Sequence, residues 1–185
     1  MTFGHPTDFA IEAYHEPYGP EWGGCGRMCI HVQGVPLGNI RENHCSLFHA
    51  ADLCRQTSAA LGTLWDESFA GLSDAGIFAA VEHDHRVAEK PNWGRFGRFY
   101  FLTFAGEPFD GFNIMVVCRP DNRVHILYTL PDGTFGAASC SVESFRHAAE
   151  SFVLWFDEQV RTVGPPFFPI NPFDLSETVP DNRND

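Results

Sequence analysis

Apolar and polar residues alternate along residues 8–15 and again along residues 28–32. The apolar positions of these two segments are Phe9, Ile11, Ala13, Met28, Ile30 and Val32. Such alternation is typical of a β-strand that buries one face. The stretch between the segments is rich in Gly, Pro and aromatic residues, as loops are. The pattern therefore predicts a β-hairpin near the N-terminus.

Two longer segments have apolar residues three or four positions apart, which is the spacing of one face of an α-helix. The first follows Ser46, a residue type that caps helix N-termini well. The second follows Ser141, carries Glu143 in its first turn and Arg161 in its last, and stops at Gly164. The two apolar stripes are Leu47, Ala51, Cys54, Ser58 and Leu61, and Phe145, Ala149, Phe152 and Phe156.

The remaining segments predict more strands and a shorter helix. We expect a helix over residues 64–70 and strands over residues 77–82 and 98–104, the last of which is almost continuously apolar. Three further strands separated by the turn sequences RPDN and PDG predict an antiparallel meander. The meander strands are residues 112–118, 123–130 and 134–140.

These elements predict a fold of the α+β class in a single domain. It would be mainly antiparallel sheet, built from the N-terminal hairpin and the C-terminal meander, and packed by the two main helices. We assign residues 1–163 to this domain. Residues 164–185 are rich in proline, and we expect a tail whose first part docks on the domain and whose end is mobile.

The charge of the chain is strongly negative, with 24 acidic against 12 basic residues and a formal net charge of −12. A body of this charge repels phosphate backbones, which disfavours nucleic acid as a partner. It would instead attract a basic protein and accelerate the encounter. Acidity that only keeps the protein soluble is the alternative interpretation.

The first residues, MTFGHPTDF, have neither a cationic segment nor an apolar segment of the kind found in secretory signals. No apolar run approaches the ~18 residues of a membrane span. We therefore expect a cytoplasmic protein without membrane contact. The 6 cysteines would then be thiols, since the cytosol is reducing.

Motifs of known catalytic sites are missing from the sequence, which has no nucleophile elbow, P-loop or H-E-x-x-H. The cysteine spacing does not form paired C-x-x-C motifs, so we expect buried thiols, no bound metal and no cofactor. His83 and His85 would share one side of an extended segment. With a distant carboxylate they could hold a metal, and a small metal-dependent enzyme is therefore one alternative function.

The loop of the N-terminal hairpin combines carboxylates with aromatic side chains at Glu16, Tyr18, Glu21 and Trp22. Tyr and Trp dominate the energetics of many protein interfaces, and neighbouring carboxylates would meet Arg or Lys of a partner. The loop is thus a candidate binding site. The alternative is that Trp22 folds back onto the sheet as a lid.

The segments FGHPTDFAIE and GPEWGGCGRMCIHVQGVPLGN, followed by the helix at Leu47, resemble the start of the immunity protein 42 family of bacterial polymorphic-toxin systems. That family opens with G-D-P-x-x-F-A-I and continues with a G-x-W segment and an aromatic-rich second strand. Here His5 stands in place of the expected Asp, and Cys29 and His31 occupy strand positions that are often aromatic.

The resemblance implies an α+β protein that binds and silences a toxin delivered between bacteria, without catalysing a reaction. The partner would be a toxin domain, expected to be basic. The family offers no residue-level binding motif, so the loop residues are our candidates, with Asp66, Glu67 and Asp110 as further carboxylates. A self-associating adaptor of a secretion system is the other alternative, and the sequence leaves the oligomeric state open.

Overall fold

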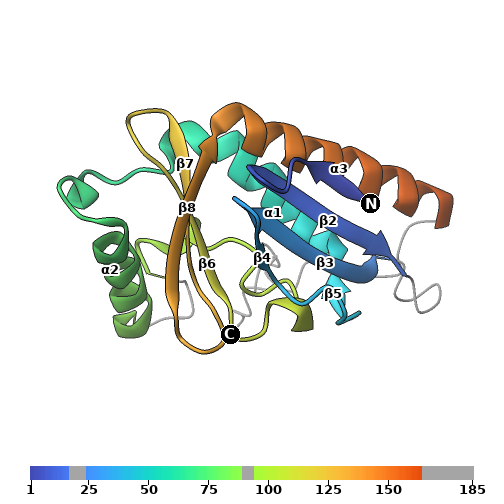
Figure 1. Cartoon of the computed structure of the whole chain (residues 1–185), viewed down its shortest axis with the longest axis horizontal. Helices are drawn as coiled ribbons and strands as arrows, with labels where there is room; N and C mark the ends of the chain where they lie inside the picture. The colour runs from blue at the N-terminus through green and yellow to red at the C-terminus, as the bar shows by residue number, and fades with distance from the viewer. Residues whose placement is uncertain (17–23, 89–93, 164–185) are drawn as a thin grey trace, which may run out of the picture.

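Two antiparallel sheets and three α-helices make up the computed structural model, which describes residues 1–16, 24–88 and 94–163 (Figure 1). Buried side chains from both sheets and from all three helices belong to one hydrophobic core cluster. The fold is a single α+β domain, as predicted. The tail at residues 164–185 lies outside the described residues, so its docking stays a prediction. In the described part of the chain, no helix has the length and apolar character needed to cross a membrane.

The first sheet contains the predicted hairpin. Its strands are β1 (Thr2–Gly4), β2 (Phe9–His15), β3 (Cys25–Val32), β4 (Val35–Leu37) and β5 (Cys45–Ser46). The order is β1-β2-β3-β4, and β5 also pairs with β3. Ile11 lies opposite Ile30 in the β2–β3 register, which places the apolar residues of both strands on one face. The short β1 strand carries no alternation long enough to predict it.

The second sheet is the predicted meander. It runs β6 (Asn113–Cys118), β7 (Arg123–Thr129) and β8 (Phe135–Ser141), with β7 in the middle. The turns between these strands place Asn122 at φ 63° and Gly133 at φ 83°. Asn and Gly tolerate these left-handed conformations better than other residues, which explains why the sequences RPDN and PDG predict turns.

Helices α1 (Leu47–Ala60) and α3 (Val142–Val163) lie side by side and cover the apolar face of the first sheet (Figure 1). Both begin at the predicted serine caps: Ser46 Oγ accepts from the His49 N–H at 3.3 Å, and Ser141 Oγ accepts from the Ser144 N–H at 3.0 Å. Phe145 stacks on Phe9 of β2 with ring centroids 4.7 Å apart. The predicted stripe of α3 is fully buried, which fixes the helix on the sheet.

The predicted strand at residues 77–82 is wrong, because this segment belongs to the helix α2 (Asp74–Val87). Ser73 caps it, with Oγ accepting from the Gly76 N–H at 3.2 Å. Ile77, Phe78 and Val81 fall on one helical face and are buried. A short apolar run does not by itself distinguish a strand from one buried face of a helix. The serine cap at Ser73 is the local signal that favours the helix.

The predicted strand at residues 98–104 is also wrong. A 3-10 turn covers Gly97–Phe99, Tyr100 forms a single bridge to Met115, and Leu102 has a φ of 60°. The segment is apolar because Phe99, Phe101 and Leu102 are fully buried in an irregular path through the core. The predicted helix at residues 64–70 is reduced to a 3-10 turn over Glu67–Phe69, capped by Asp66.

Candidate functional site

Glu16 is the one residue of the predicted loop site that the structure describes; Tyr18, Glu21 and Trp22 lie outside the described residues. Glu16 follows β2 and pairs with Arg27 of β3, whose Nε donates to Glu16 Oε2 at 2.8 Å and whose Nη2 donates to Oε1. These hydrogen bonds lower the pKa of the Glu16 carboxyl. The described contacts therefore do not test the loop site, which stays a prediction.

Asp66 and Glu67, the second pair of candidate carboxylates, lie in the connection between α1 and α2. The Asp66 carboxylate accepts hydrogen bonds from the Ser68 hydroxyl at 2.6 Å and from Arg95 Nη2 at 2.6 and 2.8 Å. The hydrogen bonds from Ser68 and then the Arg95 guanidinium lower its pKa to about 2. Asp66 thus already uses its charge to hold a turn, whereas Glu67 is exposed.

Asp110 lies at a hollow of about 470 Å³ that contains two more carboxylates, Glu42 and Glu107. Glu107 starts the 3-10 turn Glu107–Phe109, and Asp110 follows it directly. Glu42 comes from the connection between β4 and β5, which is tied to this turn by the Asn39 N–H donating to the Pro108 carbonyl at 2.7 Å. We call the three carboxylates and the surface between them the acidic hollow.

Gly106 makes the close approach behind the acidic hollow possible. It has a φ of 130°, and a Cβ at this position would lie 2.2 Å from the His44 carbonyl oxygen. Its bridge to Cys45 brings the strand β5 against the turn that carries Glu107. Because the contributing segments are far apart in the sequence, no local pattern predicts that Glu42 and Glu107 lie beside Asp110.

The acidic hollow combines negative charge with apolar surface. His44 Nδ1 lies 2.8 Å from Glu107 Oε2, and Asn39 Nδ2 donates to Glu42 Oε1 at 3.2 Å. The Asp110 carboxylate makes no hydrogen bond or ion pair with another described residue. The apolar lining consists of Pro108, Phe112 and Pro131. Such a surface suits an Arg or Lys side chain, whose aliphatic stem and cationic head need both kinds of contact.

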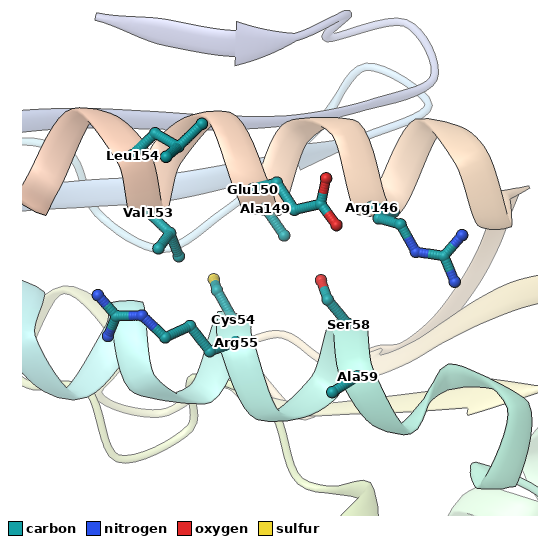
Figure 2. Close-up of a pocket in the computed structure, with 9 residues that line it drawn as sticks. All are labelled: Cys54, Arg55, Ser58, Ala59, Arg146, Ala149, Glu150, Val153 and Leu154. Atoms are coloured by element: carbon teal, nitrogen blue, oxygen red, sulfur yellow. The ribbon is translucent and has the colours of Figure 1, made fainter.

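A second hollow, of about 570 Å³, lies between α1 and α3 (Figure 2). Cys54 and Ser58 point up from α1 toward Ala149 and Val153 of α3, and the Ser58 hydroxyl has no hydrogen-bond partner among the described residues. Arg55 and Arg146 lie at opposite ends, as Figure 2 shows. Glu150 also lines this groove, but the two arginines outnumber its carboxylate, so the groove suits a basic partner less well than the acidic hollow does.

The outward face of the first sheet carries a cluster of Glu12, Cys29 and His31 that the sequence pattern did not predict. His31 Nε2 lies 2.9 Å from Glu12 Oε2 and 3.5 Å from Cys29 Sγ. The hydrogen bond from His31 lowers the pKa of Glu12, while burial and the nearby carboxylate raise the pKa of the Cys29 thiol to about 12. The expectation of buried cysteines is correct for Cys29, Cys45, Cys54, Cys118 and Cys140, whereas Cys25 is half-buried.

The predicted arrangement of His83 and His85 on one side of an extended segment is wrong. Both belong to α2, where residues two positions apart point about 200° away from each other around the helix axis. Among the described residues, the group of His, Cys, Asp or Glu side chains that comes close enough to share a metal ion is Glu12, Cys29 and His31. The structure thus removes the geometric basis of the His83/His85 enzyme alternative.

Comparison with family models identifies the chain's relatives. The model described as immunity protein 42 matches residues 1–155. The chain belongs to the immunity protein 42 family. This confirms the resemblance drawn from the N-terminal segments and gives the chain an immunity role, as an antitoxin in competition between bacteria.

The fold of this immunity protein 42 member is similar to a solved structure, the crystal structure of CdiI from Burkholderia dolosa AUO158. The two share 13% identity at a TM-score of 0.62, over 84% of this chain and 99% of that chain. At this identity the likeness concerns the fold. A comparison with curated proteins gave no match. The immunity protein 42 family points to a binding role without catalysis.

Proposed function

We propose that this chain neutralises its cognate toxin by placing the acidic hollow over a basic site of the toxin, and that it catalyses no reaction itself. The observation that carries the proposal is the grouping of Glu42, Glu107 and Asp110 around an apolar lining. The toxin would contribute an Arg or Lys that enters between these carboxylates, and blocking this side chain would silence the toxin. The chain would act in the cytoplasm of the cell that it protects.

The net charge of −12 supports a basic partner, because opposite long-range charge increases the rate of encounter. The hollow itself would occupy the centre of a larger contact. A stable complex buries about 800 Å² on each partner, so exposed residues around the hollow must contribute as well. We expect the energetic centre to be the desolvated pairing at Asp110, whose carboxylate has no partner among the described residues.

The loop residues Tyr18 and Trp22, with Glu16 and Glu21, form a second proposed contact. Their residue types suit an interface, because Tyr and Trp are enriched among the residues that dominate binding energy. The two locations make different demands on the toxin: the hollow needs a cation, whereas Tyr18 and Trp22 need an apolar pocket. Asp66 and Glu67 come third, because the Asp66 charge is already neutralised by Arg95.

The test is binding of the cognate toxin, measured by calorimetry, together with survival of cells that express the toxin. The double substitution Glu107→Gln and Asp110→Asn should weaken binding at least about 100-fold, because buried charge pairs contribute several kcal/mol at interfaces. The matched control is Asp52→Asn with Glu158→Gln, which removes the same charge from exposed positions on α1 and α3.

Unchanged binding by the hollow variant would contradict its role. The loop variant Tyr18→Ala with Trp22→Ala then locates the contact, because a loss of protection with an unchanged melting temperature would assign the interface to the loop. If both variants bind and protect like the original chain, toxin binding by an acidic and aromatic surface is wrong.

A further inference from the structure

The cluster of Glu12, Cys29 and His31 is produced by the register of two strands. Glu12 lies directly opposite Cys29 in the β2–β3 pairing, and His31 follows Cys29 by two positions on the same face of β3. Strand residues two apart point to the same side, so the three side chains converge on the outward face of the sheet. Their neighbours Ile11 and Ile30 point inward and are fully buried.

We propose that Glu12 Oε2, Cys29 Sγ and His31 Nε2 bind a divalent transition-metal ion, for which Zn²⁺ is the best fit. The inference goes beyond toxin neutralisation and does not depend on it. The three ligand atoms lie within 4.8 Å of one another. The site would be three-coordinate from the chain, with a fourth position open to solvent.

The ligand separations fit a tetrahedral ion. Zn–S bonds of about 2.3 Å and Zn–N or Zn–O bonds of about 2.0–2.2 Å, at tetrahedral angles, place the ligand atoms about 3.4–3.6 Å apart. Here Sγ and Nε2 are 3.5 Å apart, Sγ and Oε2 3.8 Å, and Nε2 and Oε2 2.9 Å. An ion can therefore enter with shifts of about 0.5 Å or less in the side chains.

The chemistry of the set selects the metal. A thiolate, an imidazole and a carboxylate suit Zn²⁺, whereas Mg²⁺ and Ca²⁺ prefer ligand sets made of oxygen. The Zn–S bond forms as the Cys29 thiol proton leaves to solvent. His31 binds as the neutral ring through Nε2, whose proton leaves to solvent while Nδ1 carries the remaining N–H. Thiolate and carboxylate together then balance the charge of the ion.

Neighbouring groups prepare the site and leave a route to it. The Tyr14 hydroxyl donates to Glu12 Oε1 at 3.0 Å and so orients the carboxylate with Oε2 toward His31. Such outer contacts tune metal sites strongly. The His31 and Glu12 side chains are 19% and 23% exposed, whereas Cys29 is 2% exposed. An ion can thus reach the site from solvent, and the thiolate would lie on its dry side.

The first test is metal uptake by the full, tag-free chain after treatment with a chelator and a reductant. We expect one Zn²⁺ per chain and a rise in melting temperature of about 5–10 °C at zinc concentrations about 100 times Kd. Co²⁺ as a spectroscopic probe should give tetrahedral d–d bands and a thiolate-to-cobalt charge-transfer band. Absence of stoichiometric uptake, or a Co²⁺ spectrum without the thiolate band, would overturn the proposal.

Variants separate this site from binding elsewhere. Cys29→Ser and His31→Gln should each weaken zinc binding at least about tenfold and remove the thiolate band or change its intensity. Cys25→Ser, a half-buried cysteine on the same strand, is the matched control and should bind like the original chain. Equal binding by all three variants would mean that the trio is a hydrogen-bonded cluster only. If a variant fails to fold, the Co²⁺ spectrum of the unsubstituted chain still tests the site, because it shows directly whether a thiolate binds the metal.

Discussion

The carboxylates of this acidic chain differ in whether they form hydrogen bonds and ion pairs within the chain. Asp66 binds Ser68 and Arg95, and the side chain is 9% exposed. Asp110 is exposed and makes no such contact with the described residues. A carboxylate that already has partners would lose them on binding a toxin, whereas Asp110 has only its hydration to lose. This difference is why the proposed contact is centred on Asp110.

The charge of Asp66 should stabilise the fold only above acidic pH. Its folded-state pKa of about 2 lies below the unfolded value of about 3.9. The stabilisation is therefore complete above pH ~4 and disappears as the pH falls through about 2. Urea unfolding of the original chain and of Asp66→Asn should differ most at neutral pH and converge near pH 2. A stability difference that is independent of pH would show that the charge does not matter.

At the scale of elements, α3 joins the two halves of the fold. It packs on β1 and β2 of the first sheet, on β7 and β8 of the second, and along α1. Its buried side chains contact rings of the first sheet and of the irregular segment at residues 100–104: Phe152 meets Phe3, and Phe145 meets Phe9 and Phe101. The helix thus fixes the relative position of the sheets, and with it the surfaces that each sheet presents.

Truncation of one ring in this helix should be costly. Phe152→Ala leaves a cavity next to Phe3 and Phe156, and we expect a loss of about 3–5 kcal/mol in the free energy of unfolding. Leu154→Ala is the control, because this residue of the same helix is 70% exposed. Its effect should stay within about 0.5 kcal/mol. Equal losses in the two variants, measured by urea unfolding, would contradict the assigned inner face.

At the scale of the whole molecule, the negative charge and the local hollow act over different distances. The charge of −12 extends its influence over about a Debye length, which shrinks as salt is added. In the proposed function, the hollow would act only after contact. The overall charge would then set the speed of encounter, and the hollow would set the lifetime of the complex.

The association rate with a basic toxin should fall at least about tenfold between low salt and ~0.5 M salt, with a smaller change in the dissociation rate. The physical reason is that screening weakens long-range attraction more than it weakens pairing in a desolvated contact. Stopped-flow mixing at several salt concentrations measures both rates. An association rate that does not respond to salt would contradict the basic partner, even if binding is tight.

The sequence by itself determined the elements whose signals are local. Each of these signals involves residues that are close in the sequence, so the sequence pattern alone predicts the element. They are the caps at Ser46 and Ser141, the stripe from Phe145 to Phe156, and the turns at Asn122 and Gly133. The family resemblance likewise depended on contiguous segments. The long alternation of β2 and β3 predicted the hairpin for the same reason.

Tertiary structure alone decided the rest. Residues 98–104 are apolar because most of them are buried, although they do not form a strand. The apolar residues of 77–82 form the buried face of a helix. Strand register brought Glu12 opposite Cys29, and a bridge at Gly106 brought Glu107 beside Glu42. Sequence patterns report which side chains are buried along one element. Whether side chains distant in the sequence come into contact depends on how those elements pair. Packing of the whole core determines that pairing, and no single segment of the sequence specifies it.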